Sequence, residues 1–202
     1  MKNKLIILAI VVSVALSSCA TVQVARVSSD TAVDLSGYWN DTDVRLVCKD
    51  LIDKCLSSPR VAGFEAKNKR LPVIMVGQFK NDSTEHIDTS IITEKMSDAI
   101  INSGLADFVA DRSEREELRQ ERKDQNLGGY TSEESMKNMG NETGADFMLK
   151  GSVKTIVDKA GNKTVRTYFV YVQLINLETN VVMFKASNEE IKKIIKTKTP
   201  KL

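Results

Sequence analysis

The chain is poor in histidine, cysteine and proline, and it carries almost no net charge. Its 202 residues contain one histidine, three cysteines and three prolines, and 29 basic residues face 27 acidic ones. A strong basic excess is the usual mark of a nucleic-acid-binding protein, so this composition argues against that class. With His86 as the only histidine, the chain is also short of the ligands that zinc sites use. We therefore expect no nucleic-acid partner, no metal and no cofactor.

The first nineteen residues have the pattern of an export signal. Lys2 and Lys4 precede an apolar run, residues 5–16, that is too short to span a bilayer as a helix. The run ends in Leu16-Ser17-Ser18-Cys19, which resembles a bacterial lipobox. This pattern predicts a signal peptide at 1–18 and acylation of Cys19, for example by palmitate; an ordinary secretory peptide with a chance cysteine is the alternative. Removing residues 1–18 leaves 27 basic and 27 acidic residues, so the predicted mature protein is nearly neutral.

The residues after the predicted acylation site divide into a tether and a domain. Residues 19–34 are small and polar, with Ala20 and Thr21 directly after the cysteine. These positions lack the aspartate that retains many enterobacterial lipoproteins in the inner membrane, which favours the outer membrane with the domain facing the periplasm. Two or more acyl chains hold a protein on a bilayer essentially permanently. Residues 35–202 have the length of one domain with its own core.

Recognisable catalytic motifs are missing from the chain. Ser83 and Asp88 lie near His86, and these are the residue types of a serine hydrolase, but no Gly-x-Ser-x-Gly elbow accompanies them. The pair Gly128-Gly129 lacks the Lys-Ser/Thr that completes a phosphate loop. Acidic pairs are so common here that counting them does not exclude a glycan-cleaving carboxylate pair. A binding protein is favoured over an enzyme, with an envelope hydrolase as an alternative.

Cys48 and Cys55 lie in a predicted amphipathic helix. Apolar residues recur at helical spacing at positions 44, 47, 48, 51, 52, 55 and 56, so both thiols face the same side. Seven residues at a rise of about 1.5 Å each place them about 10 Å apart, beyond the reach of a disulfide. We expect two buried cysteines that pack as small apolar side chains. Asn40 or Asp41 is the expected N-cap, and the only tryptophan, Trp39, is expected to fix the preceding segment to the domain.

The remaining pattern predicts an α/β (α+β) fold with one mixed sheet flanked by helices. A continuous apolar run at 72–79 is typical of a strand covered on both faces. We expect a helix at 89–103 ending at Gly104, a short strand at 108–110, and two helices at 113–126 and 131–144 separated by a Gly128-Gly129-Tyr130 break. Strands at 147–157, 164–176 and 181–184 and a lysine-rich terminal helix complete the order β-α-β-α-α-β-β-β, with four to five strands. Residues 59–70 are interpreted as a charged connector.

Three segments resemble the LpoB lipoproteins. They are VGQFKNDSTEHIDT at 76–89, GADFMLKG at 144–151 and LINLETN at 174–180, with SGYWND at 36–41 as a further marker, and the resemblance extends over residues 35–190. LpoB proteins are outer-membrane lipoproteins that bind a bifunctional penicillin-binding protein and stimulate its peptidoglycan synthesis. The resemblance therefore implies a lipid-anchored, non-catalytic regulator of cell-wall synthesis and cell shape. Enterobacterial members carry a long proline-rich tether, whereas the tether here is short and poor in proline.

The Gly-Ala-Asp turn at 144–146 also resembles parts of other envelope proteins. Curli-export lipoproteins and the N-terminal domain of TolB contain similar β-α-β-β pieces. An assembly or secretion lipoprotein is therefore an alternative. Such a protein should oligomerise and carry long amphipathic membrane hairpins, and only the region at 164–176 is long enough.

The predicted helix at 113–126 has the surface most suggestive of a partner. Arg115, Arg119 and Lys123 recur four residues apart, and Arg122 lies nearby. A neighbouring acidic stripe consists of Glu114, Glu117, Glu121 and Asp124. Like charges at this spacing destabilise a helix by a few tenths of a kcal/mol each, which is compatible with a partner-facing role, although a merely solvated helix is the simpler alternative. If a synthase docks here, we expect Arg115, Arg119, Arg122 and Tyr130 to contact it, since Arg and Tyr are favoured interface anchors.

The end of the chain is rich in lysine. The five lysines are Lys192, Lys193, Lys196, Lys198 and Lys201. They could contact anionic headgroups or wall polymers, but a frayed, solvated terminus is the simpler interpretation.

Overall fold

The computed structural model of the 202-residue chain describes residues 24–29 and 31–197. The chain divides into two units, residues 1–31 and residues 32–202. The described residues of the first unit contain no helix or strand, and the N–H of Thr31 donates to the carbonyl of Ser28 at 3.0 Å. The predicted signal peptide and Cys19 lie outside the described residues. No helix within 24–29 and 31–197 has the length and apolar character needed to span a bilayer.

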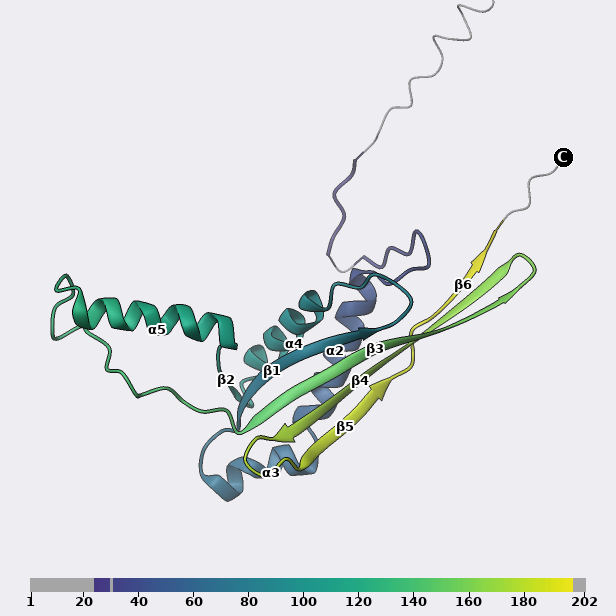
Figure 1. Cartoon of the computed structure of the whole chain (residues 1–202). Coiled ribbons are helices and arrows are strands. Elements are labelled where there is room, and N and C mark those ends of the chain that lie inside the picture. The colour runs from purple at the N-terminus through teal and green to yellow at the C-terminus, as the bar shows by residue number, and fades with distance from the viewer. Residues whose placement is uncertain (1–23, 30, 198–202) are drawn as a thin grey trace, which may run out of the picture. The chain divides into compact units, whose positions relative to one another are not determined.

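A mixed β-sheet organises the second unit (Figure 1). The described strands are β1 Val73–Asp82, β2 Asp107–Phe108, β3 Phe147–Ala160, β4 Lys163–Asn176, β5 Val182–Asn188 and β6 Lys192–Lys196. They lie in the order β2-β1-β3-β4-β5, and β6 pairs with the beginning of β4. Strand β1 is parallel to β2 and β3, whereas β4 is antiparallel to both of its neighbours, β3 and β5. The predicted α+β fold with a mixed sheet is confirmed.

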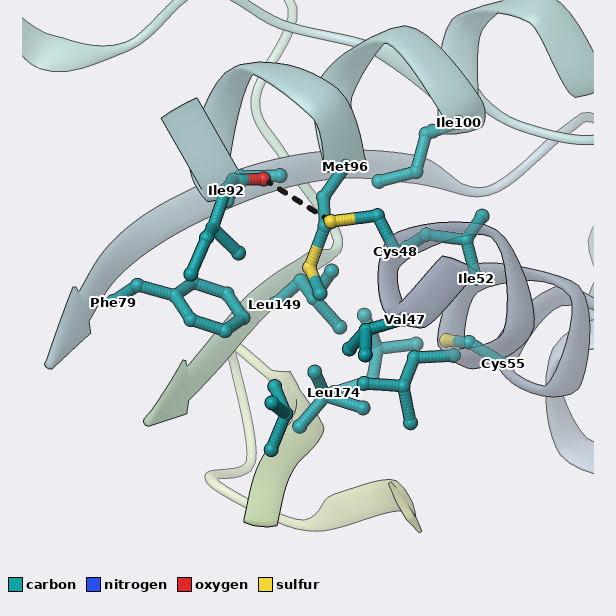
Figure 2. Packing of buried hydrophobic residues seen from close by; sticks show 14 of the residues in the cluster. Val47, Cys48, Ile52, Cys55, Phe79, Ile92, Met96, Ile100, Leu149 and Leu174 are labelled. Carbon is teal, nitrogen blue, oxygen red and sulfur yellow. Dashed lines mark hydrogen bonds between the residues drawn. The ribbon is translucent and has the colours of Figure 1, made fainter. Parts of the chain in front are cut away.

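The described helices are α2 Asp41–Leu56, α3 Pro59–Asn68, α4 Thr89–Ser103 and α5 Arg112–Leu127. Helices α2 and α4 pack together on one face of the sheet, α4 against β1 and α2 against β4 and β5 (Figure 1). Figure 2 shows part of the core that these helices form with the strands: Cys48 of α2 points toward Ile92 of α4, and Met96 of α4 points toward Leu149 of β3. None of the described helices covers the opposite face of the sheet.

Helix α2 confirms the prediction made around the two cysteines. Asn40 is its N-cap: the Asn40 side chain accepts from the N–H of Asp43 at 3.1 Å, and the Asp43 carboxylate accepts from the N–H of Asn40 at 3.0 Å. Cys48 and Cys55 are free and buried, and burial raises the pKa of each thiol to about 12. The Cys48 Sγ lies 3.8 Å from the carbonyl oxygen of Ile92 (Figure 2). Both thiols therefore stay neutral and pack as apolar groups.

A close approach between β1 and β3 depends on Gly151. The register of these strands shifts between Val76 and Phe79, which places the buried Phe79 ring over Gly151. A Cβ at position 151 would overlap two carbons of that ring and the carbonyl oxygen of Tyr171. Because Gly151 has no side chain, the ring of Phe79, one of the largest buried side chains, fits against it.

Aromatic residues attach the segment before α2 to the sheet. Trp39 packs on Tyr168 with ring centroids 5.2 Å apart, as expected of the only tryptophan. The backbone N–H of Trp39 donates to Glu85 at 3.2 Å, and the Tyr168 hydroxyl donates to the same carboxylate at 2.8 Å. The Arg166 guanidinium lies 3.8 Å from the centre of the Tyr38 ring and 3.4 Å from Glu85. These contacts hold the start of the domain against β4.

The segment interpreted as a connector contains helix α3. Pro59 lies in its first turn, where the missing N–H of proline costs no hydrogen bond. Val61 is buried, and Phe64 packs edge-on against Phe147 with ring centroids 5.4 Å apart. The prediction was wrong because two inward-facing apolar residues in a charged stretch are too few to give a helical period.

The prediction of a terminal helix in the lysine-rich sequence is also wrong. Residues 192–196 form β6, antiparallel to β4. Lys193 and Ile195 alternate inward while their neighbours are exposed. Lys193 lies 2.6 Å from Asp43 and 2.7 Å from Asp34, so this lysine does not belong to a frayed, solvated tail. Lys198 and Lys201 lie outside the described residues.

Candidate functional site

Helix α5 and residues 128–146, which return the chain to β3, are here called the arm (Figure 1). None of the α5 residues is buried. Asp111 is the N-cap: its carboxylate accepts from the N–H of Glu114 at 2.9 Å, and Glu114 accepts from the N–H of Asp111 at 2.8 Å. The helix therefore begins at Arg112, one residue before the predicted start at 113, and the Ser113 hydroxyl donates to Asp111 at 2.7 Å.

The returning part of the arm has no helix at 131–144, so that prediction is wrong. Within residues 131–144, Met136 is the only apolar residue that is even half-buried, and Gly140 has a φ of +89°. An isolated segment without an apolar stripe gains too little from packing to form a stable helix. Its backbone is instead hydrogen-bonded to α5: the Asn126 amide donates to the carbonyl of Lys137 at 3.0 Å, and the N–H of Lys137 donates to Gln125 at 3.3 Å.

Arg119 and Arg122 converge on Glu142 of the returning segment. Arg119 donates from Nε and Nη2 to the two carboxylate oxygens of Glu142 at 2.9 and 2.8 Å, and Nη2 of Arg122 lies 3.0 Å from Glu142. Arg119 also donates to Glu116 at 2.7 Å. The hydrogen bonds from Arg119 lower the pKa of Glu142 to about 2, and the same bonds raise the pKa of Arg119. Two-point pairing of this kind fixes the plane of a guanidinium, so Glu142 holds both arginines in place.

Arg115 and Tyr130, the other two predicted contact residues, form no hydrogen bond or ion pair with Glu142 in the described part of the chain. Arg115 is half-buried, and its Nε is enclosed without a hydrogen-bond partner among the described residues. Tyr130 is 99% exposed and follows the end of α5 at Gly128. Gly128 is nine positions after Arg119, which corresponds to about 14 Å along the helix axis. The arm therefore brings Arg119 and Arg122 together but spreads the predicted surface along its length.

The acidic stripe of α5 also contains apolar surface. Glu114, Glu117, Glu121 and Asp124 line one shallow depression together with Leu118. Leu118 is 49% exposed, and Leu127 at the end of the helix is 81% exposed. Exposed Leu and Tyr beside oriented charges form a surface that a protein partner can cover.

The polar loop around His86 has a structural role. Asp88 caps α4 by accepting from the N–H of Ser90 at 3.0 Å, and Ser83 donates to Asn81 at 2.6 Å. Within the described residues His86 makes no hydrogen bond to Ser83 or Asp88, so the geometry of a catalytic triad is not formed. In the same part of the chain, no group of three or more His, Cys, Asp and Glu side chains is placed to hold a metal.

Sequence reasoning missed a second candidate surface, on the open face of the sheet. Lys80, Lys150, Lys154 and Lys185, here called the lysine face, line a hollow of about 380 Å³. Lys150 and Lys154 are four residues apart in a predicted strand, so the strand period alone places these two of the four lysines on the same face of β3. Lys80 and Lys185 join them only through the order of the strands in the sheet.

Comparisons with known proteins give one family and several solved structures. The family model described as "Peptidoglycan-synthase activator LpoB" matches residues 43–190, more than half of the chain. The chain is similar to the LpoB C-terminal domain from Salmonella enterica, with 17% identity, 77% of this chain and 99% of that chain covered, and a TM-score of 0.41. The LpoB C-terminal domain from Escherichia coli is 16% identical, with 72% of this chain and 96% of that chain covered and a TM-score of 0.44. The NMR structure of E. coli LpoB is 12% identical, with 90% of this chain and 85% of that chain covered and a TM-score of 0.42. No curated protein matches the chain. The family match runs from α2 through β5 and includes the arm.

Proposed function

Because the chain belongs to the LpoB family of peptidoglycan-synthase activators, we propose that it binds a bifunctional penicillin-binding protein and stimulates its synthesis of peptidoglycan. The chain is an envelope protein and a regulator, not an enzyme. The family match carries the proposal. The lipid anchor at Cys19 and the location in the outer membrane, facing the periplasm, are supported by the sequence of residues 1–21.

The arm is the proposed contact with the synthase, through Arg115, Arg119, Arg122 and Tyr130. Tyr130 offers a fully exposed aromatic ring, and Arg and Tyr are over-represented among residues that dominate binding energy. Glu142 already orients the guanidinium groups of Arg119 and Arg122. Side chains that are ordered before binding lose less conformational entropy when the complex forms.

Activation requires that the arm distinguish two states of the synthase. A ligand that binds an active and an inactive conformation equally well shifts no equilibrium. A tenfold increase in the active fraction requires about 1.4 kcal/mol of preferential binding. One or two well-packed anchor residues are sufficient for that difference, since truncating such residues commonly costs about 2 kcal/mol or more.

The test measures binding to the bifunctional penicillin-binding proteins of the same organism, and the rate at which they polymerise glycan strands, with the full-length chain in detergent. We expect binding and a faster rate. Tyr130→Ala, and Arg119→Gln combined with Arg122→Gln, should each weaken binding about tenfold or more. Glu142→Gln is the matched control because it removes the internal partner of the arginines but keeps their charge; it should stay within about threefold of the unmodified chain.

Two outcomes would count against this proposal. Equal losses for the arginine variant and for Glu142→Gln would mean that the arginines only hold the arm together. If no synthase binds or responds, the assembly or secretion lipoprotein becomes the better interpretation.

A further inference from the structure

The lysine face is a cluster of cations on neighbouring strands. Lys150 of β3 lies opposite Gln173 of β4, which lies opposite Lys185 of β5. Strands are spaced about 4.8 Å apart, so the backbones of these two lysines are about 10 Å apart. Lys80 of β1 is in register with Ser152, midway between Lys150 and Lys154, which are about 13 Å apart along β3.

These lysines have no anionic partners in the described part of the chain. None of the four forms an ion pair there, whereas Lys49, Lys54, Lys95 and Lys193 are all paired with acids. Asp82 is the only acidic residue lining the hollow. The Lys154 ammonium lies 5.9 Å from the centre of the Tyr171 ring. Four lysines and one aspartate leave a net positive charge in the hollow, and an excess of charge of one sign attracts ions of the opposite sign.

The hollow is open to a large ligand. Helices α2 and α4 lie on the opposite face of the sheet (Figure 1). Between the lysines, the lining consists mostly of uncharged polar side chains: Gln78, Gln173, Ser152 and Tyr171. Amides and hydroxyls of this kind pair with the hydroxyl and amide groups of sugars and peptides.

The choice of lysine points to a solvated polyanion rather than to a protein interface. Interface cores are depleted in lysine and enriched in arginine and aromatic residues, and arginine is the residue better suited to desolvated ion pairs. All four cations here are lysines, and the hollow contains one aromatic ring. Charges spread over roughly 8–13 Å suit several anionic groups along an extended ligand better than one compact anion.

We propose that the lysine face binds carboxylate-bearing glycan–peptide strands, the class of polymer that a peptidoglycan synthase makes. This inference rests on the proposed function, because the synthase supplies the polymer. The carboxylates of the peptides pair with the lysines, and the polar side chains between them accept and donate hydrogen bonds to the strand.

The test is co-sedimentation of the full-length chain, in detergent, with purified peptidoglycan sacculi. Lys150→Gln, Lys154→Gln and Lys185→Gln are combined in one variant. The control variant combines Lys49→Gln, Lys67→Gln and Lys95→Gln, which removes the same charge from exposed positions on helices α2, α3 and α4. Three exposed ion pairs of ordinary strength correspond to about tenfold in affinity, so the first variant should bind about tenfold more weakly and the control should bind normally. Sacculi whose carboxylates have been amidated should not bind.

Other outcomes would overturn the inference. One is that the unmodified chain does not sediment with sacculi, and another is that both variants lose the same amount of binding. A third is that the chain binds phosphatidylglycerol vesicles and not sacculi, which would assign the lysine face to lipid phosphate. Equal thermal unfolding midpoints of the two variants establish that each is folded.

The synthase assay separates this inference from the proposed function. The lysine-face variant should still bind and stimulate the synthase through the arm. Sacculus binding that depends on the lysines without any synthase response would refute the proposed function and keep the site. A synthase response without sacculus binding would support the proposed function and refute the assignment of the lysine face to glycan–peptide strands.

Discussion

Replacing Lys193 by methionine should destabilise the domain much more than its position near the chain terminus suggests. The Lys193 ammonium lies 2.6 Å from Asp43 and 2.7 Å from Asp34, and it also donates to the carbonyl of Tyr38 at 3.0 Å. Methionine keeps most of the aliphatic stem but leaves the Asp43 carboxylate buried without its counter-ion. The backbone N–H of Asn40 then remains as a donor to that carboxylate, at 3.0 Å.

The expected loss follows from the burial of the three charges. Breaking a fully buried ion pair by removing one partner costs about 3–5 kcal/mol. The side chains of Asp43 and Lys193 are 5% and 11% exposed, but that of Asp34 is 53% exposed and can be hydrated. We therefore expect a decrease of about 2–3 kcal/mol in the free energy of unfolding, or about 5–10 °C in Tm for a domain of this size.

The loss should depend on pH. Burial raises the pKa of Asp43 even with Lys193 in place, and removing the ammonium raises it further. A carboxyl with a higher pKa in the folded than in the unfolded state binds more protons when folded, so the free energy of unfolding falls as pH rises between the two values. The deficit of Lys193→Met should thus be largest at neutral pH and shrink as pH falls below the raised pKa of Asp43.

Urea unfolding followed by the fluorescence of Trp39 measures this effect. Trp39 is the only tryptophan and packs on Tyr168. Lys192→Met is the matched control because Lys192 is the exposed neighbour on the same strand; it should change stability by less than about 0.5 kcal/mol. Combining Lys193→Met with Asp43→Asn should recover part of the loss, since no buried charge is then unpaired. Equal effects at positions 192 and 193 would refute the reasoning and favour a solvated terminus.

Three further predictions concern the core, a surface ion pair and the thiols. Gly151→Ala should lower the free energy of unfolding by about 2–3 kcal/mol, because the added methyl overlaps a core ring and a backbone carbonyl. Gly63 lies inside α3 with open space around it, so Gly63→Ala should raise the free energy of unfolding by about 0.5–1 kcal/mol in the same urea titration. Arg70 donates two hydrogen bonds to the Asp146 carboxylate, both at 2.6 Å, and Asp146→Asn should cost about 1 kcal/mol at pH 7. Because the hydrogen bonds from Arg70 lower the pKa of Asp146, this difference should disappear as pH falls through that lowered pKa. A thiol reagent at pH 8 should leave Cys48 and Cys55 unlabelled in the native protein and label both in urea, as mass spectrometry of peptides would show.

Each of these predictions has an outcome that contradicts it. Equal and small effects at the two glycines would mean that β1 and β3 are not in close contact at Gly151. An Asp146→Asn deficit that persists in acid would mean that the loss does not come from the ionised carboxylate. Labelling of Cys48 without urea would mean that α2 and α4 do not pack as described.

Elements with a complete local signal could be predicted from the sequence. Helix α2 shows an apolar period over sixteen residues and an N-cap, and α4 ends at Gly104 as its sequence indicates. Strands β3 and β4 are long and rich in β-branched residues. In these elements local propensity and burial point to the same structure, so no distant contact is needed to decide it.

Elements decided by distant contacts could not be predicted in this way. The stretch Ile191 to Lys196 fits a helical period as well as a strand period. Its strand conformation is fixed by pairing with β4 and by the Lys193 contact with Asp34, 159 residues away in the sequence. The same holds for the arm: Arg119 and Arg122 could be identified as candidates, but their shared partner Glu142 lies 23 residues from Arg119 in a segment without a helical period.

The two proposed surfaces use different cations, and this difference predicts how they respond to salt. On the arm, the arginines are oriented by Glu142, and the same arm carries the exposed apolar side chains of Leu118, Leu127 and Tyr130, so a partner that covers the arm can desolvate the arginines. On the lysine face, the four ammonium groups form no ion pair with any described residue, line an open hollow with one aspartate, Asp82, and stay hydrated. Raising the ionic strength from 0.1 to 1 M shortens the Debye length from about 10 Å to about 3 Å, which weakens hydrated pairs more than desolvated ones. Binding of glycan strands should therefore be lost at a salt concentration that still permits synthase binding. At low salt, two contacts from one domain act at a high effective concentration, and a synthase together with its own product would retain this protein longer than either would alone.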